Sequence, residues 1–277
     1  MLKKLLASEK QLVVPGVYDA LSAHIASQCG FDVLYMSGFA VAGSLLAKPD
    51  IGLLTASEMT ERARQIVEAA QGTPVIADGD NGYGGEHNVS RLVQGYESAG
   101  VQCIQLEDQV SPKRCGHMNN KQVVGLDEAV SKIQAAVKGR SSDSFLIMAR
   151  TDARATHDLA EALRRGKAFL EAGADILFVE APESIEEMKQ VKTSFPGTSL
   201  VANMVEEGKT PELTANELAD LGFQIILRPV SALLTAAKSL QLSYQALRQT
   251  SQLQSTQPRF SFSGFNELVG LEKFDQI

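Results

Sequence analysis

Eight short apolar runs recur along the chain, and each ends in or next to a polar residue. They are VVPGVYD (13–19), VLYMSG (33–38), PVIADGD (74–80), CIQLED (103–108), FLIMARTD (145–152), ILFVEA (176–181), SLVANM (199–204) and IILRPV (225–230). Their lengths suit β-strands, and most are too continuously apolar for a strand with one face in water. Runs of this kind are typical of parallel strands that are buried on both faces.

Helix-length stretches separate most of these runs. ASEMTERARQIVEAA (56–70) and LAEALRRGKAFLEA (159–172) have amphipathic spacing, and CGFD (29–32), AGVQ (99–102), AGAD (172–175) and LGFQ (221–224) each place a glycine where a helix should end and a strand begin. A strand–helix unit repeated eight times predicts a single (β/α)₈ barrel over residues 1–277. A doubly wound open sheet is the structural alternative.

Composition narrows the classes of partner. A hydrophobic content of 44% allows a large core, and a net charge of −7 argues against nucleic acid and against an anionic membrane surface. No apolar run approaches the roughly 20 residues that span a bilayer, and the first residues lack the pattern of a signal peptide. Three cysteines without a CxxC pair indicate neither a disulfide framework nor a zinc site, so we expect a cytoplasmic protein.

The carboxyl ends of the predicted strands are rich in acids. Asp78 and Asp80 end one run, Glu107 ends the next, and Asp50 follows the second run in KPDIG. Parallel barrels keep their chemistry at this rim, because all eight strand ends converge there. Carboxylates that converge repel one another unless a cation lies among them, and oxygen ligands suit Mg²⁺, with Mn²⁺ as the other option. Helix caps and exposed turn acids are the competing interpretation of these four residues.

The segment SPKRCGHMNNK (111–121) is too polar for the core and places one of three cysteines two positions from one of four histidines. It resembles the catalytic loop of the isocitrate lyase and phosphoenolpyruvate mutase superfamily, in the lyase branch. The segments IADGDNGYGG, IMARTDARA, VEAP and NMVEEGKTP resemble the same superfamily. The resemblance covers nearly the whole chain. It implies a mobile loop over Mg²⁺ at the rim of a (β/α)₈ barrel, and homotetramers that exchange C-terminal helices.

The resemblance also implies a reaction, the cleavage of a carbon–carbon bond in a 2-hydroxy acid. The departing fragment leaves as a carboxylate enolate that must be protonated on carbon, and a thiol whose acidity is tuned by nearby charge suits that task. The implied catalytic residues are Cys115 as the general acid, Lys113, Arg114 and His117 around it, the rim arginine Arg150, and the substrate-side acid Glu180. A papain-like nucleophile and a plain surface cysteine are the rival interpretations of Cys115.

Other positions carry over as substrate-binding residues. Ser37, Gly38 and Phe39 in MSGF match the loop that binds one substrate carboxylate, Gly116 lies in the catalytic loop, and Asn203 and Thr210 match a second carboxylate-binding stretch. The metal positions are Asp78, Asp80, Asp50 and Glu107. The partner is therefore expected to be a small dicarboxylate.

Departures from the pattern narrow the choice within the superfamily. Leu234 and Phe265 stand where methylisocitrate lyases carry arginines, so a third substrate carboxylate would lack charged partners. Phe39 replaces a glycine found there in those enzymes. The closest resemblance is to the group that contains the petal death protein and dimethylmalate lyase, and we predict a 2-alkylmalate lyase. Methylisocitrate lyase, oxaloacetate hydrolase or decarboxylase, a phosphonate mutase or hydrolase, and a non-catalytic metabolite-binding barrel are the alternatives.

The end of the chain carries a separate pattern. Leu233, Ala237, Leu240, Tyr244 and Leu247 draw an apolar stripe along one predicted helix. We expect residues 232–277 to form a helical extension in which FNELVGLEKF (265–274) is a second helix and QSTQPRFSFSG (254–264) a polar connector. The stripe either packs on its own barrel or, as the resemblance implies, reaches into a neighbouring subunit.

Overall fold

The computed structural model describes residues 1–8, 10–116, 118, 120–253 and 258–274. The chain divides into two compact units, Met1–Leu233 and Leu234–Ile277. The first unit is the barrel and the second is helical, and each is described by itself.

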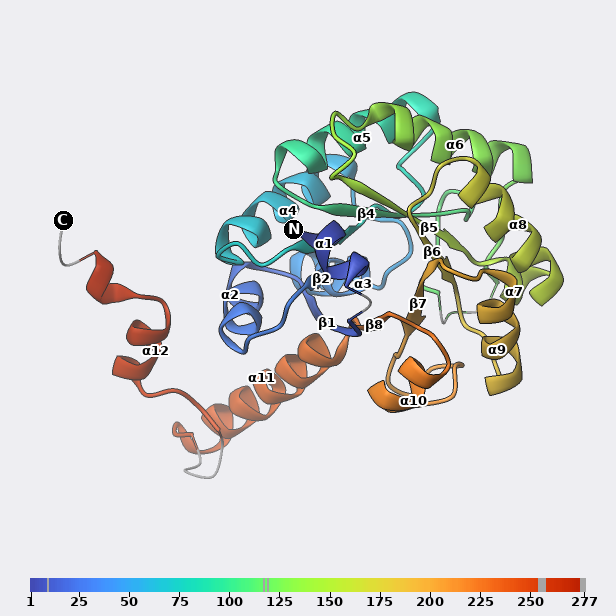
Figure 1. Cartoon of the computed structure of the whole chain (residues 1–277). Helices are drawn as coiled ribbons and strands as arrows, with labels where there is room; N and C mark the ends of the chain where they lie inside the picture. Colours follow the sequence, from blue (N-terminus) through green and yellow to red (C-terminus); the bar gives the residue numbers. More distant parts are fainter. Residues whose placement is uncertain (9, 117, 119, 254–257, 275–277) are drawn as a thin grey trace. The chain divides into compact units, whose positions relative to one another are not determined.

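The first unit is a closed barrel of eight parallel strands (Figure 1). The strands are β1 Leu12–Val17, β2 Leu34–Met36, β3 Val75–Asp78, β4 Cys103–Glu107, β5 Leu146–Thr151, β6 Ile176–Val179, β7 Ser199–Asn203 and β8 Ile225–Arg228. All eight apolar runs therefore contain a strand. Because β8 pairs with β1, as in the register Leu12 with Ile225, the sheet closes and the open-sheet alternative is wrong.

Helices surround the barrel and connect its strands. They are α2 Ala20–Gln28, α3 Gly38–Val41, the π-helical turn η1 Ala42–Leu46, α4 Ala56–Ala69, α5 Glu86–Ser98, α6 Leu126–Gly139, α7 Ala153–Thr156, α8 Leu159–Glu171, α9 Ile185–Ser194 and α10 Ala215–Asp220. The glycines of the four recurring phrases have left-handed backbones, with φ from 82° at Gly30 to 102° at Gly173. Each phrase ends a helix with the conformation that glycine adopts at no steric cost, as predicted.

The strands are buried on both faces, and this explains why their sequences show little alternation. Inside the barrel lie residues such as Val14, Ile76 and Met148, which pack in one cluster. Between the strands and the helices lie their neighbours, such as Ala77 and Ile147, in a second and larger cluster. Apolar side chains are thus required at successive positions of the same strand.

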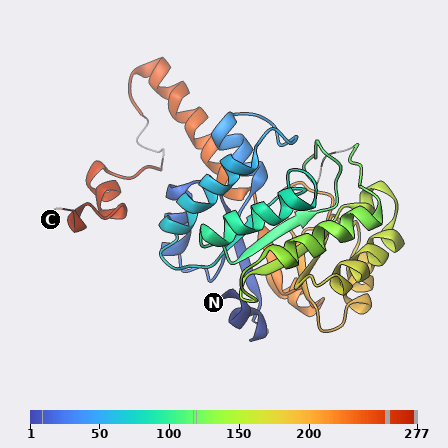
Figure 2. The same ribbon diagram turned by 90° about the horizontal axis from the view of Figure 1, so that it is seen from above.

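The two ends of the barrel differ. A short helix that the sequence analysis did not anticipate, α1 Leu2–Ala7, lies across the end where the strands begin, and its Leu2 belongs to the interior cluster. In Figure 2 this helix, in dark blue, lies at the opposite end of the barrel from the green loop around residues 111–121. The carboxyl ends of the strands therefore share one mouth with that loop.

The C-terminal unit is built on the end of α11 Ser231–Thr250 and on α12 Phe262–Leu268, which a 3₁₀ turn Leu271–Lys273 follows. Both predicted helices are present, although Phe262, Ser263 and Gly264 belong to α12 and not to a connector, because Ser261 caps the helix at that point. Residues 254–257 of the connector lie outside the described part. Among the described residues, no helix is long and apolar enough to cross a membrane.

Candidate active site

The four predicted metal-binding acids lie at the carboxyl ends of neighbouring strands. Asp78 is the last residue of β3, Asp80 follows it, Glu107 is the last residue of β4, and Asp50 precedes α4. Their exposed fractions are 6% or less. By contrast Asp19, at the end of the first run, caps α2 through the Ser22 amide, so the helix-cap interpretation holds there.

Asp78 is held in place by three hydrogen bonds. Its Oδ2 accepts from the Gly38 amide at 3.1 Å, and its Oδ1 accepts from the Asp80 amide at 3.0 Å and from Gln105 Nε2 at 3.2 Å. A Cβ on Gly38 would lie 2.7 Å from Asp78 Oδ2, so only glycine allows this approach. The Tyr35 hydroxyl donates to Gln105 Oε1 at 2.9 Å and is buried in the core.

Lys113 inserts its ammonium between two of the acids. Its Nζ lies 2.6 Å from Asp50 Oδ1 and 2.7 Å from Asp80 Oδ1, and its side chain is almost fully buried. Burial alone would lower the pKa of Lys113, but the charges of Asp80 and Asp50 outweigh it and raise that pKa well above its usual value. The lysine is therefore a permanent cation inside the acid cluster.

One lysine does not neutralise the cluster. Burial, and then the charge of Asp80, raises the pKa of Asp78 to about 6. Burial also raises the pKa of Glu107 well above its usual range, against the opposing charge of Arg150, and raises that of Asp50 against Lys113. Glu107 Oε1 is buried and has no hydrogen-bond partner among the described residues. The cluster has more negative charge than its own cations offset.

This imbalance fits a divalent ion. Among the described residues no three acidic, histidine or cysteine side chains surround one point where a metal would bind directly. The reason is that Lys113 occupies the space between Asp50 and Asp80, while both Asp78 oxygens accept backbone amides. Mg²⁺ keeps several of its waters, so acids of this kind can hold it partly through water.

A second group of charges lies on the other side of the mouth. Arg150, at the end of β5, donates from Nε and Nη2 to the two oxygens of Asp152 at 2.9 and 3.0 Å. Its Nη1 is 3.4 Å from Glu107 and its Nη2 is 3.7 Å from Glu180, and its guanidinium lies 5.2 Å from the centre of the Phe178 ring. The arginine thus spans the acids of three strand ends.

Asp152 is the best compensated acid in this group. Lys121 Nζ lies 2.6 Å from its Oδ1, the oxygen that also accepts from Arg150 Nη2. Burial alone would raise the pKa of Asp152, but Arg150 and Lys121 outweigh it and lower that pKa to about 2. Neither Asp152 nor Lys121 was among the predicted site residues, although both stand in quoted motifs.

The loop 111–121 is anchored at its base and along its length. The Val110 amide donates to Gln122 O at 3.0 Å, the Val124 amide donates to Asp108 O at 2.9 Å, and the Gln109 side chain brackets both backbone groups of Arg114. Farther along, the Cys115 amide donates to Asp50 O at 3.1 Å. The backbone of the cysteine is therefore fixed beside the acid cluster.

Gly116 shows how closely this loop approaches the barrel. A Cβ on Gly116 would lie 2.0 Å from Glu180 Oε1 and 2.3 Å from Arg150 Nη2. No larger residue fits there without displacing both side chains. The glycine after Cys115 thus brings the loop backbone against the charged groups of the mouth.

The predicted carboxylate-binding residues also lie at the mouth. Ser37 is buried and caps α3, and Phe39 in that helix is half-buried. Asn203, at the end of β7, donates to both oxygens of Glu180 at 3.3 Å. The Thr210 hydroxyl is buried without a hydrogen-bond partner in the described structure, and a ligand oxygen would satisfy it.

Two predicted residues are not placed in the mouth. Arg114 is exposed, and only its backbone is bonded to the loop base. His117 lies outside the described residues. The other predicted catalytic residues come from three segments of the chain, the loop 111–121 with Lys113 and Cys115, the end of β5 with Arg150 and the end of β6 with Glu180, and these segments meet at one end of the barrel.

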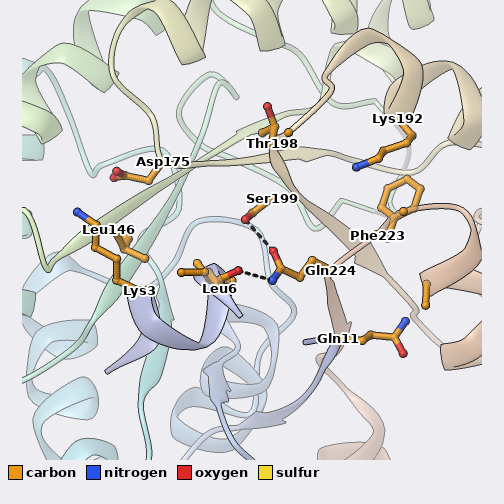
Figure 3. Close-up of a pocket in the computed structure, with 14 residues that line it drawn as sticks. Lys3, Leu6, Gln11, Leu146, Asp175, Lys192, Thr198, Ser199, Phe223 and Gln224 are labelled. Carbon is orange, nitrogen blue, oxygen red and sulfur yellow. Dashed lines mark hydrogen bonds between the residues drawn. The ribbon is translucent and has the colours of Figure 1, made fainter. Parts of the chain in front are cut away.

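A cavity of about 660 Å³ lies at the opposite end, where the strands begin. Figure 3 shows that its polar groups bond to one another, with Gln224 joining Ser199 and the carbonyl of Leu6. Asp175 in its wall is paired with Arg140 at 2.6 Å. These polar groups of the cavity are therefore paired, whereas Glu107 Oε1 and the Thr210 hydroxyl at the other end are buried without a hydrogen-bond partner among the described residues.

Comparisons with known proteins give the relatives of the chain. The family model described as phosphoenolpyruvate phosphomutase matches residues 2–248. The 2,3-dimethylmalate lyase of Eubacterium barkeri is 48% identical over 277 residues, covering 100% of this chain and 95% of that protein.

Two solved structures are similar over 99% of this chain. Oxaloacetate acetylhydrolase in complex with the inhibitor 3,3-difluorooxalacetate superposes with a TM-score of 0.94 at 34% identity, covering 94% of that chain. A phosphonopyruvate hydrolase in complex with oxalate and Mg²⁺ superposes with a TM-score of 0.88 at 30% identity, covering 95% of that chain.

Proposed function

The chain belongs to the phosphoenolpyruvate mutase and isocitrate lyase superfamily, and on that premise we propose that it cleaves a carbon–carbon bond in a 2-hydroxy dicarboxylate of the 2-alkylmalate type. The products are a 2-oxo acid and a simple carboxylate. The observation that carries the proposal is the place of Cys115, whose backbone amide is bonded to Asp50 beside the acid cluster.

The metal of this reaction is Mg²⁺, with Mn²⁺ as a substitute. Asp78, Asp80, Asp50 and Glu107 are the residues that would hold it, directly or through water. When bound there, the ion would supply Lewis-acid polarisation of the substrate oxygens, which would weaken the bond that breaks. The raised pKa values of Asp78 and Glu107 support this assignment, because an added cation would stabilise their ionised forms.

The side chains of the mouth supply the remaining steps. A carboxylate of the cluster accepts the proton of the 2-hydroxyl, the carbon–oxygen double bond forms, and the carbon–carbon bond breaks with its electron pair on the departing fragment. Arg150 stabilises the negative charge that develops on oxygen. The Cys115 thiol then delivers its proton to the departing carbon, which completes the balance of atoms and charge.

The substrate carboxylates have separate partners. Asn203 and the buried Thr210 hydroxyl, which has no hydrogen-bond partner among the described residues, are suited to one. The Ser37 hydroxyl is suited to the other, beside Gly38, whose amide already donates to Asp78. A third carboxylate lacks partners, because Leu234 and Phe265 stand where methylisocitrate lyases have arginines. A dicarboxylate is therefore favoured over methylisocitrate or isocitrate.

A substrate panel tests this function. The protein is incubated with 2-alkylmalates, oxaloacetate, methylisocitrate and phosphonopyruvate, with Mg²⁺ and with a chelator. We expect a 2-oxo acid from alkylmalates with Mg²⁺ alone, and about a 10²- to 10⁴-fold loss of kcat in Cys115→Ser, which is the usual contribution of a general acid. Turnover of a phosphonate without turnover of any malate derivative would refute the lyase assignment.

Oxaloacetate hydrolysis is the second candidate. The similarity to oxaloacetate acetylhydrolase, with a TM-score of 0.94, favours its place in the panel. A barrel that binds oxalate and Mg²⁺ but leaves every compound intact would support the non-catalytic alternative.

The assembly we propose is a homotetramer in which subunits exchange C-terminal helices. Apolar side chains of α11 are exposed in the single chain, with Tyr244 66% and Leu240 55% accessible. A water-facing stripe of this kind is typical of an interface. Light scattering after size-exclusion chromatography tests the assembly, and a monomer would contradict it. We also infer a cytoplasmic location, since all three cysteines of the sequence lie in the described part and none is in a disulfide.

A further inference from the structure

We propose that Lys121 is a positioning residue that fixes the loop backbone at Gly116, directly after Cys115, relative to the Arg150 guanidinium. This inference rests on the proposed function, in which Cys115 protonates the departing carbon. It assigns a role to a residue outside the acid cluster and outside the residues expected to touch the substrate.

The contacts of Lys121 join two parts of the site. Its Nζ donates to the carbonyl oxygen of Gly116 and lies 2.6 Å from Asp152 Oδ1. Its side chain is only 1% accessible, so water does not compete for these bonds. One ammonium thus ties the loop backbone directly after Cys115 to a carboxylate at the end of β5.

The same carboxylate orients the arginine. Asp152 accepts from Arg150 Nε and Nη2, and its backbone amide donates to Asp108 Oδ1 at 2.9 Å. Asp108 in turn lies 3.0 Å from Arg165 Nη1. Asp152 is therefore held by the barrel wall, and Lys121 links the loop backbone to this fixed carboxylate.

The close approach of Gly116 explains why this tie matters. The glycine backbone lies against Glu180 and Arg150, and the preceding Cys115 amide donates to Asp50 O at 3.1 Å. The bond to Asp50 attaches the loop on the side of the acid cluster. Lys121 attaches it on the side of the arginine.

A thiol-modification experiment tests the role without requiring turnover. Cys29→Ser removes the exposed cysteine, and Cys103 is buried, so iodoacetamide labelling of Cys115 can be followed by mass spectrometry. Lys121→Met is compared with the parent and with Lys167→Met, whose lysine is 76% exposed on α8. Thermal melts confirm that each variant is folded.

The direction of the change identifies the cause. Loss of a nearby positive charge alone would disfavour the thiolate and slow alkylation. Loss of the Lys121 bond to Gly116 O frees the backbone beside Cys115 and speeds alkylation of the thiol. We expect the alkylation rate to rise about tenfold or more in Lys121→Met, as for a lost charged hydrogen bond. In alkylmalate turnover, kcat should fall by a similar factor while KM changes little, since Lys121 is not expected to touch the substrate.

Lys121→Arg separates positioning from packing. It keeps the charge and several donors, so it should retain most of the parent's alkylation rate and kcat. An unchanged or slower alkylation rate in Lys121→Met, or an equal effect of Met and Arg, would overturn the proposal. If the parent cleaves no alkylmalate, the proposed function fails on its own, and the alkylation rates still decide the role of Lys121.

Discussion

Two carboxylates at the same mouth of the barrel are in opposite electrostatic states. Asp78 and Asp152 are both buried at the ends of strands, yet the pKa of Asp78 is raised to about 6 and that of Asp152 is lowered to about 2. Asp152 is bonded to two cations, Arg150 and Lys121. Asp78 accepts two amides and one side-chain donor, and after burial the charge that shifts its pKa most is that of another acid, Asp80.

Asp152 is paired with cations of the chain itself, whereas Asp78 belongs to a site that we propose a metal ion completes. Burying a carboxylate costs free energy unless a cation or several donors offset it. At Asp152 the chain supplies that charge from its own residues. At Asp78 and Glu107 burial raises the pKa of the carboxyl groups, and we propose that an added divalent ion offsets this cost.

The largest expected loss of stability comes from removing the negative charge of Asp152. Asp152→Asn leaves Arg150 and Lys121 without their common counter-ion, and breaking a buried pair in this way costs roughly 3–5 kcal/mol. Glu107→Gln is the matched control, because it also replaces a buried carboxylate with an amide but removes a charge that burial disfavours. Without metal its free energy of unfolding should stay within about 1 kcal/mol of the parent. Denaturant unfolding checks both, and equal losses would erase the distinction.

The pH dependence of stability should have opposite signs at the two acids. The folded pKa of Asp78, about 6 against an ordinary 3.8, means that the folded state holds an extra proton between these values, so stability falls as pH rises through that window. Relative to Asp78→Asn, the parent should lose up to about 3 kcal/mol between pH 4 and 6 in a chelating buffer.

For Asp152 the folded pKa lies below the ordinary value of 3.8, so its stabilisation is present above pH 4 and is lost as pH falls toward 2. Relative to Asp152→Asn, the parent should therefore lose stability on acidification. The pH dependence of each variant is subtracted from that of the parent, so the titrations that both proteins share cancel. Two slopes of the same sign would contradict the assignment.

Bound Mg²⁺ should raise the free energy of unfolding through the acid cluster that includes Glu107. At a Mg²⁺ concentration 100 times its Kd, linkage gives about 2.7 kcal/mol of added stability in the parent. Glu107→Gln should gain less at the same concentration, whereas Lys167→Met, altered far along an exposed helix face, should gain as much as the parent. Thermal unfolding with and without Mg²⁺ measures the difference, and an equal gain in all three proteins would place the ion elsewhere.

The fold was predictable because most strand residues are buried on both faces and four of the helices are followed by a glycine with a left-handed backbone. Runs such as CIQLED therefore gave the strands almost to the residue, as in β4 Cys103–Glu107. The helix α1 was missed because MLKKLLASEK has too few residues to show a period. The π-helical turn Ala42–Leu46 was missed because its residues differ from those of an α-helix in no visible way.

The acids of the mouth were predictable from their place at strand ends, but their partners were not. Lys113 was expected beside Cys115, and nothing in the sequence showed that its ammonium would lie between Asp50 and Asp80. Lys121 is six residues from Cys115 and 31 from Asp152, a separation that only the folded loop closes. The sequence indicates which residues reach the mouth, but only the folded structure shows which acids are paired with cations of the chain and which are not.

The most direct test of the central claim is a titration with Mn²⁺ in the presence of oxalate, read by electron paramagnetic resonance. If the acid cluster lacks a cation, about one Mn²⁺ per chain should bind. Asp78→Asn and Glu107→Gln should weaken its affinity by roughly 10- to 100-fold, the usual effect of losing a group that supports a metal. Absence of bound Mn²⁺ in the parent, or an affinity that neither substitution changes, would contradict the account.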